Sequence, residues 1–357
     1  MSFTRLEPSD FVISTDAISS TLFTNNAPSL TAAYTSSAQV NSSTGNYYVN
    51  VYDTSATSSV QFAIAYGNSV GSGSLAYNTS VDGLSPTSTI YGQWQDLVIG
   101  DENTNFVFGA ITASEFFALT FERACYKDAL FLGSLSLTLS GSGGQVTLTD
   151  NSNYVPSVQF CAAGRVFQLI SGSTGVKYSG STTTSDGFSA KSGSYGWLLP
   201  DIGTILLNPL ALAQPAVSGG IALGYSGSFA WGTNVVVSSA SSAPVTSANI
   251  SLWNSLRLAL TGGSSNDFYI NAQESITSDF IFVRPKSVEY NYSENPSFIS
   301  GSTGEVFYPS FINNPQTYIT TVGLYNDTNQ LLAVAKLSRP LPKDFTTEAL
   351  IRVKLDF

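Results

Sequence analysis

Large apolar side chains alternate with small or polar ones along residues 60–66, where Phe62, Ile64 and Tyr66 share one side. A period of two is the pattern of a β-strand with one buried face. Six closely spaced strands favour a β-sandwich in the first part of the chain. Apolar runs bounded by Gly, Asn, Asp or Ser predict the other five, at 47–52, 90–99, 104–111, 116–122 and 135–139.

Glycine and proline interrupt the predicted strands in the middle of the chain. Residues 140–145, SGSGGQ, indicate a flexible turn or hairpin tip. Residues 197–215, WLLPDIGTILLNPLALAQP, carry three prolines after Trp197, which disfavour a central strand or a long helix. We therefore predict an irregular crossover there, with short helical turns near 202–207 or 210–213.

The end of the chain has the sharpest pattern. Residues 318–325 and 330–337 are apolar-rich runs separated by the turn sequence Asn-Asp-Thr-Asn, which predicts a β-hairpin. Residues 338–345, SRPLPKDF, contain two prolines that favour extended backbone, so we expect them to carry the chain to a distant sheet edge. Residues 350–357 then predict a terminal strand tied into a sheet, with one face formed by Ile351, Val353, Leu355 and Phe357.

These patterns predict an all-β protein with β-sandwich or jelly-roll-like regions followed by a C-terminal β module. Further strands are expected at 251–260 and 267–271. We place an N-terminal all-β region at 1–215, a second β segment and connector at 216–283, and a C-terminal docking module at 284–357.

Charge narrows the set of partners. Only 11% of the 357 residues are charged, and 14 Lys and Arg against 24 Asp and Glu give a net charge of -10. A field of this sign repels phosphate, so we expect neither nucleic acid nor an anionic membrane as a partner. The first residues, MSFTRLEPSDF, lack the basic and apolar regions of a secretory signal, so we expect synthesis in a cytoplasm.

The chain contains no histidine. This excludes Ser-His-Asp and Cys-His nucleophile pairs as well as His-ligated zinc. Cys125 and Cys161 are too few for a thiolate metal site, and we expect them to be buried, unreactive thiols. We predict no catalytic residue, no metal site and no cofactor.

Carboxylates remain the available acids and bases. The neighbours Asp101 and Glu102 lie in the turn-forming sequence GDENTN, and the spacing of Glu115 and Glu122 is not diagnostic of a glycosidase pair. Five aromatic side chains could form sugar platforms: Tyr91, Trp94, Trp197, Trp231 and Trp253. Such side chains are more often core residues.

Several segments resemble a family of virion structural proteins of contractile-tailed bacteriophages, notably marine and cyanobacterial ones. In the first two thirds they are RLEPSDFVISTDAISSTLF, VQFAIAYGNSVGSGS, PTSTIYGQWQDLVIGDEN and SGSYGWLLPDIGTILLNP. The C-terminal sequence FVRPKSVEYNYSENPSFI, with residues 318–357, is similar to a module that recurs near the ends of several proteins of such phages. Within it, GLYNDTNQLLAVAKL resembles the strand-turn-strand attachment segments of tail-fibre and baseplate proteins.

The resemblance implies a structural component of the virion, in the tail, baseplate or neck region, that forms a homo-oligomer within a symmetric particle. Half of all basic residues, seven of 14, lie between Arg284 and Lys354. They could meet acidic neighbours, such as the N-terminal half of an adjacent copy. The candidate assembly interface consists of Arg284, Lys286, Tyr318, Tyr325, Lys336, Arg339, Lys343, Arg352, Lys354 and Phe357.

Two other classes of function stay open. One is a carbohydrate-binding tail adhesin or spike. The other is a depolymerase, for which substitution of Asp101, Glu102, Glu115 or Glu122 would abolish hydrolysis of host polysaccharide. A capsid decoration protein is a further alternative within the structural class.

Overall fold

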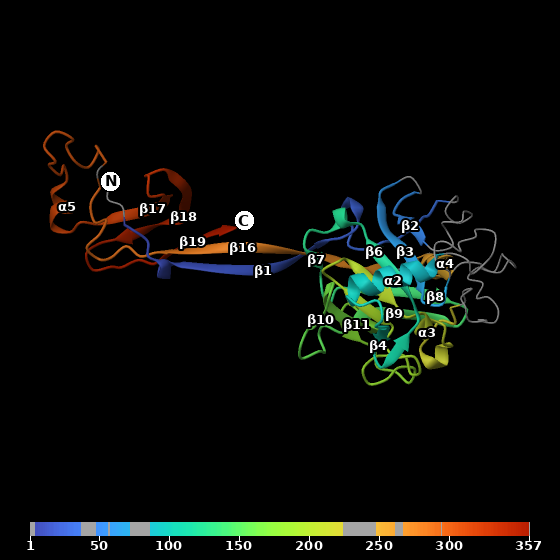
Figure 1. The fold of residues 1–357 in the computed structure, drawn as a ribbon. Coiled ribbons are helices and arrows are strands. Elements are labelled where there is room, and N and C mark those ends of the chain that lie inside the picture. Colours follow the sequence, from blue (N-terminus) through green and yellow to red (C-terminus); the bar gives the residue numbers. More distant parts are fainter. Residues whose placement is uncertain are drawn as a thin grey trace. The chain divides into compact units, whose positions relative to one another are not determined.

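The computed structural model describes residues 4–36, 48–55, 58–71, 86–223, 248–260, 267–293 and 295–356. Strands dominate the described chain, so the all-β prediction is confirmed. The chain forms two compact units. Unit 1 comprises Met1–Ala17 and Ser275–Phe357, and unit 2 comprises Ile18–Glu274 (Figure 1).

Unit 2 is built on one large antiparallel sheet. In spatial order its strands are β15 (Phe268–Tyr269), β8 (Ser136–Gly141), β9 (Gly144–Asp150), β11 (Gly164–Ser173), β13 (Gly196–Leu199), β14 (Thr204–Leu207), β6 (Glu115–Phe121), β3 (Val60–Asn68) and β2 (Tyr48–Tyr52). The short strands β10 (Gln159–Cys161) and β12 (Val176–Lys177) pair with β11. Around the sheet lie the small hairpin β4 (Phe106–Phe108) and β5 (Ile111–Ala113), the helix α3 (Pro209–Leu212), and the 3-10 turns Thr24–Asn26, Arg123–Cys125 and Ala216–Ser218.

The sheet of unit 2 is buried on both faces. Strand β6 reads EFFALTF, and its side chains alternate between two hydrophobic clusters. Phe117 and Leu119 pack in the larger cluster with helix α4 (Ala248–Leu260), whereas Phe116 packs in the smaller one with helix α2 (Thr87–Val98). A continuous apolar run is what a central strand covered on both sides requires.

Both main helices of unit 2 lie where the sequence predicted strands. The prediction at 90–99 was wrong, since α2 covers this segment and buries Tyr91, Gln95 and Val98 at intervals of four and three residues. The prediction at 251–260 was wrong in the same way, because α4 occupies it. Helical spacing of buried residues therefore outweighs β-favouring composition in both segments.

Residues 197–215 are not an irregular crossover. They form strands β13 and β14, two central strands of the sheet, followed by α3. The prolines fall outside the strands: Pro200 lies in the connecting turn and Pro209 is the first residue of α3, where its missing N–H costs nothing. Likewise, the single strand predicted at 104–111 is the hairpin β4–β5, because Gly109 turns the chain at φ +67.

Arg165 of β11 and Asp201 of the β13–β14 turn form a bidentate ion pair. The Asp201 carboxylate accepts hydrogen bonds from the Arg165 backbone N at 2.8 Å, from Nη2 at 2.6 Å and from Nε at 3.0 Å. Burial opposes ionisation of Asp201, but the hydrogen bonds from Arg165 outweigh it and lower the pKa of this carboxyl.

We expect the stabilisation by Asp201 to depend on pH. A carboxyl whose pKa is lowered by folding stabilises the protein above its ordinary pKa of about 4, and this contribution is lost as the pH falls through the folded value. The difference in unfolding free energy between the wild type and Asp201→Asn should therefore be largest near neutral pH and shrink below about pH 4. A difference that stays constant down to pH 3 in chemical denaturation would contradict this explanation.

Unit 1 contains two thin layers of strands. One layer consists of β1 (Phe11–Thr21), β16 (Asn271–Val283) and β19 (Ile351–Asp356), which lie in that order, so the terminal strand is paired as predicted. Strands β1 and β16 continue into unit 2, where β16 pairs with β7 (Ala129–Leu130). The other layer is the hairpin of β17 (Thr317–Tyr325) and β18 (Leu331–Lys343), which confirms the predicted hairpin. Unit 1 also contains the short helix α5 (Pro309–Asn313) and the 3-10 turn Pro8–Asp10.

Residues 338–343 are extended as predicted, whereas Phe345 lies in a turn, and the extended residues do not cross to another edge. They belong to β18 as far as Lys343, which lies opposite Thr317 of the same hairpin. An irregularity in register between Ile319 and Thr321 accommodates Pro340, which has no N–H to donate. The compact units also divide the chain differently from the predicted ranges 1–215, 216–283 and 284–357, since residues 1–17 join the C-terminal unit.

Candidate assembly surface

Unit 1 has a very small hydrophobic core. Of the 52 buried hydrophobic residues among the described residues, only Ile281, Val322 and Val353 belong to it. Partly buried neighbours such as Leu324 and Leu337 complete the contact between the hairpin and the β16–β19 layer. A small core of this kind leaves little burial to hold the layers together.

The same unit exposes most of the large hydrophobic side chains. Sixteen of the 28 exposed large hydrophobics among the described residues lie in unit 1, which holds fewer than a third of the residues. They are Phe11, Val12, Ile13, Val288, Tyr290, Tyr292, Phe307, Tyr308, Ile312, Tyr318, Tyr325, Leu331, Leu332, Val334, Phe345 and Leu350. At roughly 150 Å² per large side chain, they present on the order of 1,300 Å² of apolar surface.

The hairpin β17–β18 displays part of this surface on a rigid support. Asn326 Oδ1 accepts hydrogen bonds from Thr328 N at 3.1 Å and from Gln330 N at 2.7 Å, which fixes the turn. Gly323 has no side chain, so the Tyr325 ring and Leu331 close over it. A Cβ at Gly323 would lie 2.9 Å from the Tyr325 ring.

We call the exposed apolar residues nearest the turn of this hairpin the hairpin patch: Tyr325, Leu331, Leu332 and Val334. Their side chains are 39%, 53%, 68% and 57% exposed. Val334 of β18 lies directly opposite Gly323 of β17 in the register. Tyr325 of β17 lies opposite Leu331 of β18, so the patch includes residues of both strands. The patch is thus a continuous apolar strip across two strands, the usual character of an interface centre.

Charged residues predicted for the interface are mostly engaged within the unit. Arg284 lies 3.6 Å from an Asp10 carboxylate oxygen. Lys354 lies 2.8 Å from an Asp356 carboxylate oxygen, and the Lys354 and Arg352 cations both sit over the Phe280 ring. Ion pairs as exposed as these contribute little to association.

Lys343 is fully buried. Its Nζ donates hydrogen bonds to the backbone oxygens of Ser287 and Asp344 at 2.9 and 2.8 Å, and to Asn291 Oδ1 at 2.8 Å. All three N–H donors are therefore used. The residue proposed from the sequence as an interface cation instead ties the 287–291 segment to the end of β18.

The remaining predicted residues have varied places. Lys286, Lys336 and Arg339 are exposed, Tyr318 is 60% exposed on β17, and Phe357 lies outside the described residues. The apolar members Leu331, Leu332 and Val334 were not selected from the sequence. The run QLLAVAKL places apolar residues on both faces of its strand, and this was the available signal.

The carboxylates considered for catalysis are not brought together. Glu115 is fully buried and accepts a hydrogen bond of 2.5 Å from Tyr66 Oη, whereas Glu122 is exposed just beyond the other end of β6. Seven residues of strand separate them by roughly 23 Å, well beyond the reach of a glycosidase pair. Asp101 accepts hydrogen bonds from Thr104 and Asn103 within an exposed turn, which lower its pKa.

The aromatic and thiol candidates are largely internal. Tyr91, Trp94 and Trp197 pack in the smaller cluster of unit 2, and Trp253 is buried in the larger one. Trp231 lies outside the described part of the chain. The two cysteines are free and half-buried, and burial raises the pKa of both thiols.

Comparison of the chain with protein-family models, with curated proteins and with solved structures found no match. Among the described residues, no helix is long and apolar enough to pass through a lipid bilayer. Across the same residues, no three Cys, Asp or Glu side chains gather in a way that would hold a metal ion.

Proposed function

We propose that this protein is a structural component of a bacteriophage virion, in the tail, baseplate or neck region, whose copies associate through unit 1. The virion assignment rests on the sequence resemblance. The mode of association rests on one observation, the concentration of exposed hydrophobic side chains on a unit that buries only three of its own. Capsid decoration is the nearest structural alternative.

Exposed apolar surface is available on unit 1 for a contact with a partner. The sixteen side chains add up to on the order of 1,300 Å² over the whole unit, and a standard interface takes roughly 800 Å² from each partner. Burying the hairpin patch against another subunit would add the apolar burial that the small core of unit 1 lacks. Stability and assembly would then be linked, as is common in oligomers whose isolated subunits are marginal.

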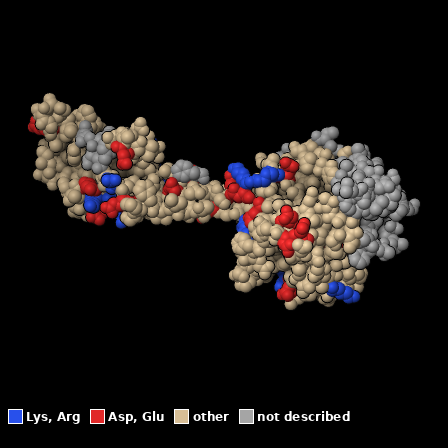
Figure 2. Space-filling model, in the orientation of Figure 1, with Lys and Arg blue, Asp and Glu red and all other residues tan. Residues whose placement is uncertain are grey.

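The charges of the two units favour a second copy of unit 1 as the binding partner of unit 1. Unit 1 carries eight Lys and Arg against eleven Asp and Glu, whereas unit 2 carries six against thirteen. Two copies of unit 1 therefore repel each other less than two copies of unit 2 would. Figure 2 shows that acidic and basic side chains cover only a small part of the visible surface. We therefore propose contact through apolar and tyrosine surface in place of the charge pairing expected from the sequence.

We expect the double variant Leu332→Lys, Val334→Lys to disrupt self-association. Both side chains are more than half exposed, so the substitutions leave the core of unit 1 intact. Placing two charges in an apolar contact should weaken association by roughly a hundredfold or more. Sedimentation velocity over a range of protein concentrations measures this effect.

The matched control is Phe160→Lys, Val176→Lys, which changes two equally exposed hydrophobics on strands of unit 2. It should self-associate as the wild type does. Equal loss in both double variants, or wild-type association of the hairpin variant, would refute the assignment of the contact to the hairpin patch.

A further inference from the structure

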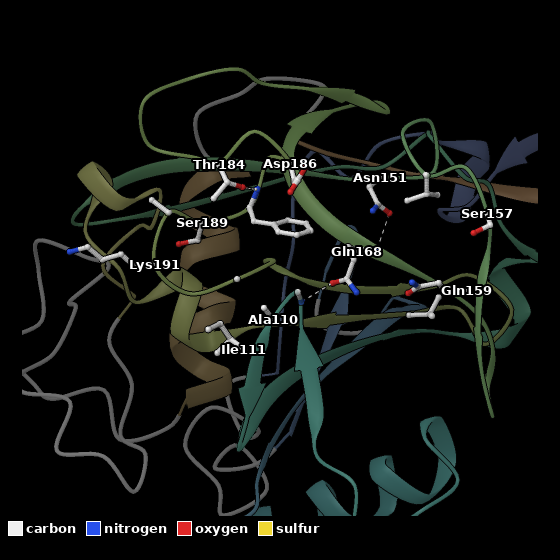
Figure 3. A pocket seen from close by; sticks show the side chains of 16 residues that line it. Ala110, Ile111, Asn151, Ser157, Gln159, Gln168, Thr184, Asp186, Ser189 and Lys191 are labelled. Atoms are coloured by element: carbon white, nitrogen blue, oxygen red, sulfur yellow. Dashed lines mark hydrogen bonds between the residues drawn. The ribbon is translucent and has the colours of Figure 1, made fainter.

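A hollow of about 580 Å³ lies on unit 2, above the middle of β11. Its floor is formed by Val166 and Gln168, two residues apart on the same strand. Three segments surround it: the β4–β5 turn, residues 151–159, and residues 184–193 between β12 and β13 (Figure 3). This volume lies within the range of small-molecule sites.

Two carboxamides are held in fixed orientations at this hollow. Gln168 Oε1 accepts hydrogen bonds from Ser194 Oγ at 2.6 Å and from Gly109 N at 3.3 Å. Asn151 Oδ1 accepts one from Gln168 N at 3.0 Å (Figure 3). Since both amide oxygens are engaged, the available groups of the two side chains are their NH₂ donors.

The opposite wall supplies acceptors and an apolar surface. Asp186 and Thr184 line the hollow from one loop, and the same loop contributes Phe188. The loop is fixed by the hydrogen bonds from Gly187 N to Thr184 O at 3.0 Å and from Phe188 N to Thr184 Oγ1 at 3.2 Å. Val155 and Ile111 add further apolar lining.

The charges that line the hollow balance, with Asp186 as its one acid and Lys191 as its one base. A single lysine is a weak basis for holding phosphate or sulfate, which are usually bound by several cations or by a helix N-terminus. A purely apolar ligand would leave the amides and the carboxylate desolvated and unpaired.

We propose that this hollow binds a neutral saccharide. A sugar ring offers hydroxyl groups that both donate and accept hydrogen bonds around an apolar C–H face. The hydroxyl oxygens can accept from Asn151 and Gln168, the hydroxyl hydrogens can be donated to Asp186, and the C–H face can pack against the Phe188 ring. Trp94, Trp197 and Trp253, which were considered from the sequence, do not line the hollow.

The test is a titration of the full-length protein with neutral trisaccharides, namely maltotriose, cellotriose, mannotriose and N,N′,N″-triacetylchitotriose, followed by ligand-detected NMR and calorimetry. At least one should bind with a dissociation constant of about 1 mM or below. Asp186→Asn and Phe188→Ala should each weaken binding by roughly tenfold or more. Asp186 is exposed, so its amide variant keeps the fold even if Phe188→Ala does not.

Glu102→Gln, an isosteric change at an exposed turn outside the hollow, is the matched control and should bind as the wild type does. The proposal is overturned if no neutral trisaccharide binds, if binding is unchanged in both hollow variants, or if only an anionic sugar such as glucose 6-phosphate binds. The hollow and the hairpin patch share no residue, so each result stands apart from the association experiment.

Discussion

Replacing Gly196 by Ala is expected to prevent unit 2 from folding. Gly196 begins β13 at φ +144 and pairs with Leu207 in the centre of the sheet. A Cβ there would lie 1.8 Å from the backbone oxygen of Leu206 and 2.8 Å from its carbonyl carbon. Backbone atoms of a central strand cannot move aside as a side chain can, so we expect a loss of more than about 4 kcal/mol.

The matched control for this substitution is Gly92→Ala. Gly92 lies inside helix α2, where a Cβ would meet no atom within 4 Å. Alanine should stabilise the helix by about 0.5–1 kcal/mol. Chemical denaturation of both variants measures the two effects. A Gly196→Ala protein as stable as the wild type would contradict the position of β13 between β11 and β14.

Replacing Lys343 by Met is expected to unfold or strongly destabilise unit 1. Methionine has nearly the same length but cannot donate to Ser287 O, Asn291 Oδ1 or Asp344 O. Three acceptors around a fully buried position would lose their charged donor, at a cost of about 3–5 kcal/mol. Because unit 1 has so small a core, this cost is a large share of its stability.

Hydrogen exchange resolved by peptide measures this loss, since protection should fall in β17, β18 and β19 while β6 and β11 keep theirs. Lys286→Met is the control, because Lys286 is exposed in the same unit, and it should change stability by less than about 0.5 kcal/mol. Unchanged protection in Lys343→Met would show that the buried ammonium is not what holds the 287–291 segment.

Strands marked by a period of two, by a bounded apolar run or by clear turn chemistry could be predicted from the sequence. The segments 60–66 and 116–122 correspond to β3 and β6, and the hairpin at 318–337 corresponds to β17 and β18. In each, a local pattern agrees with the final environment: alternation in β3, a bounded apolar run in β6 and turn chemistry in the hairpin. A short window of sequence therefore holds the information.

The two helices were predicted as strands because their amino-acid composition favours strands, whereas the spacing of their buried residues is helical. Helix α2 contains Thr, Ile, Tyr and Trp, which favour strands, yet Tyr91, Gln95 and Val98 fall on one helical face. Such conflicts are decided by which residues the sheet buries, and that depends on strands distant in sequence. The prolines of 197–215 led to the wrong prediction of an irregular crossover for a related reason. They lie at the ends of β13, β14 and α3 and not in their interiors.

The surface of unit 1 could be predicted only in part. The sequence indicated a docking role for the C-terminal segment, and it favoured the basic residues. Burial of Lys343 and pairing of Arg284 with Asp10 both depend on contacts far along the chain, so no local pattern reveals them. The assignment of residues 1–17 to unit 1 depends likewise on the pairing of β1 with β16.

A density map of the assembled particle, at a resolution that separates strands, is the direct test of association through unit 1. We expect Leu332 and Val334 of each copy to be buried against unit 1 of another copy. A map in which the β17–β18 hairpin faces solvent on all sides, while the surface of unit 2 makes the contacts between subunits, would contradict it.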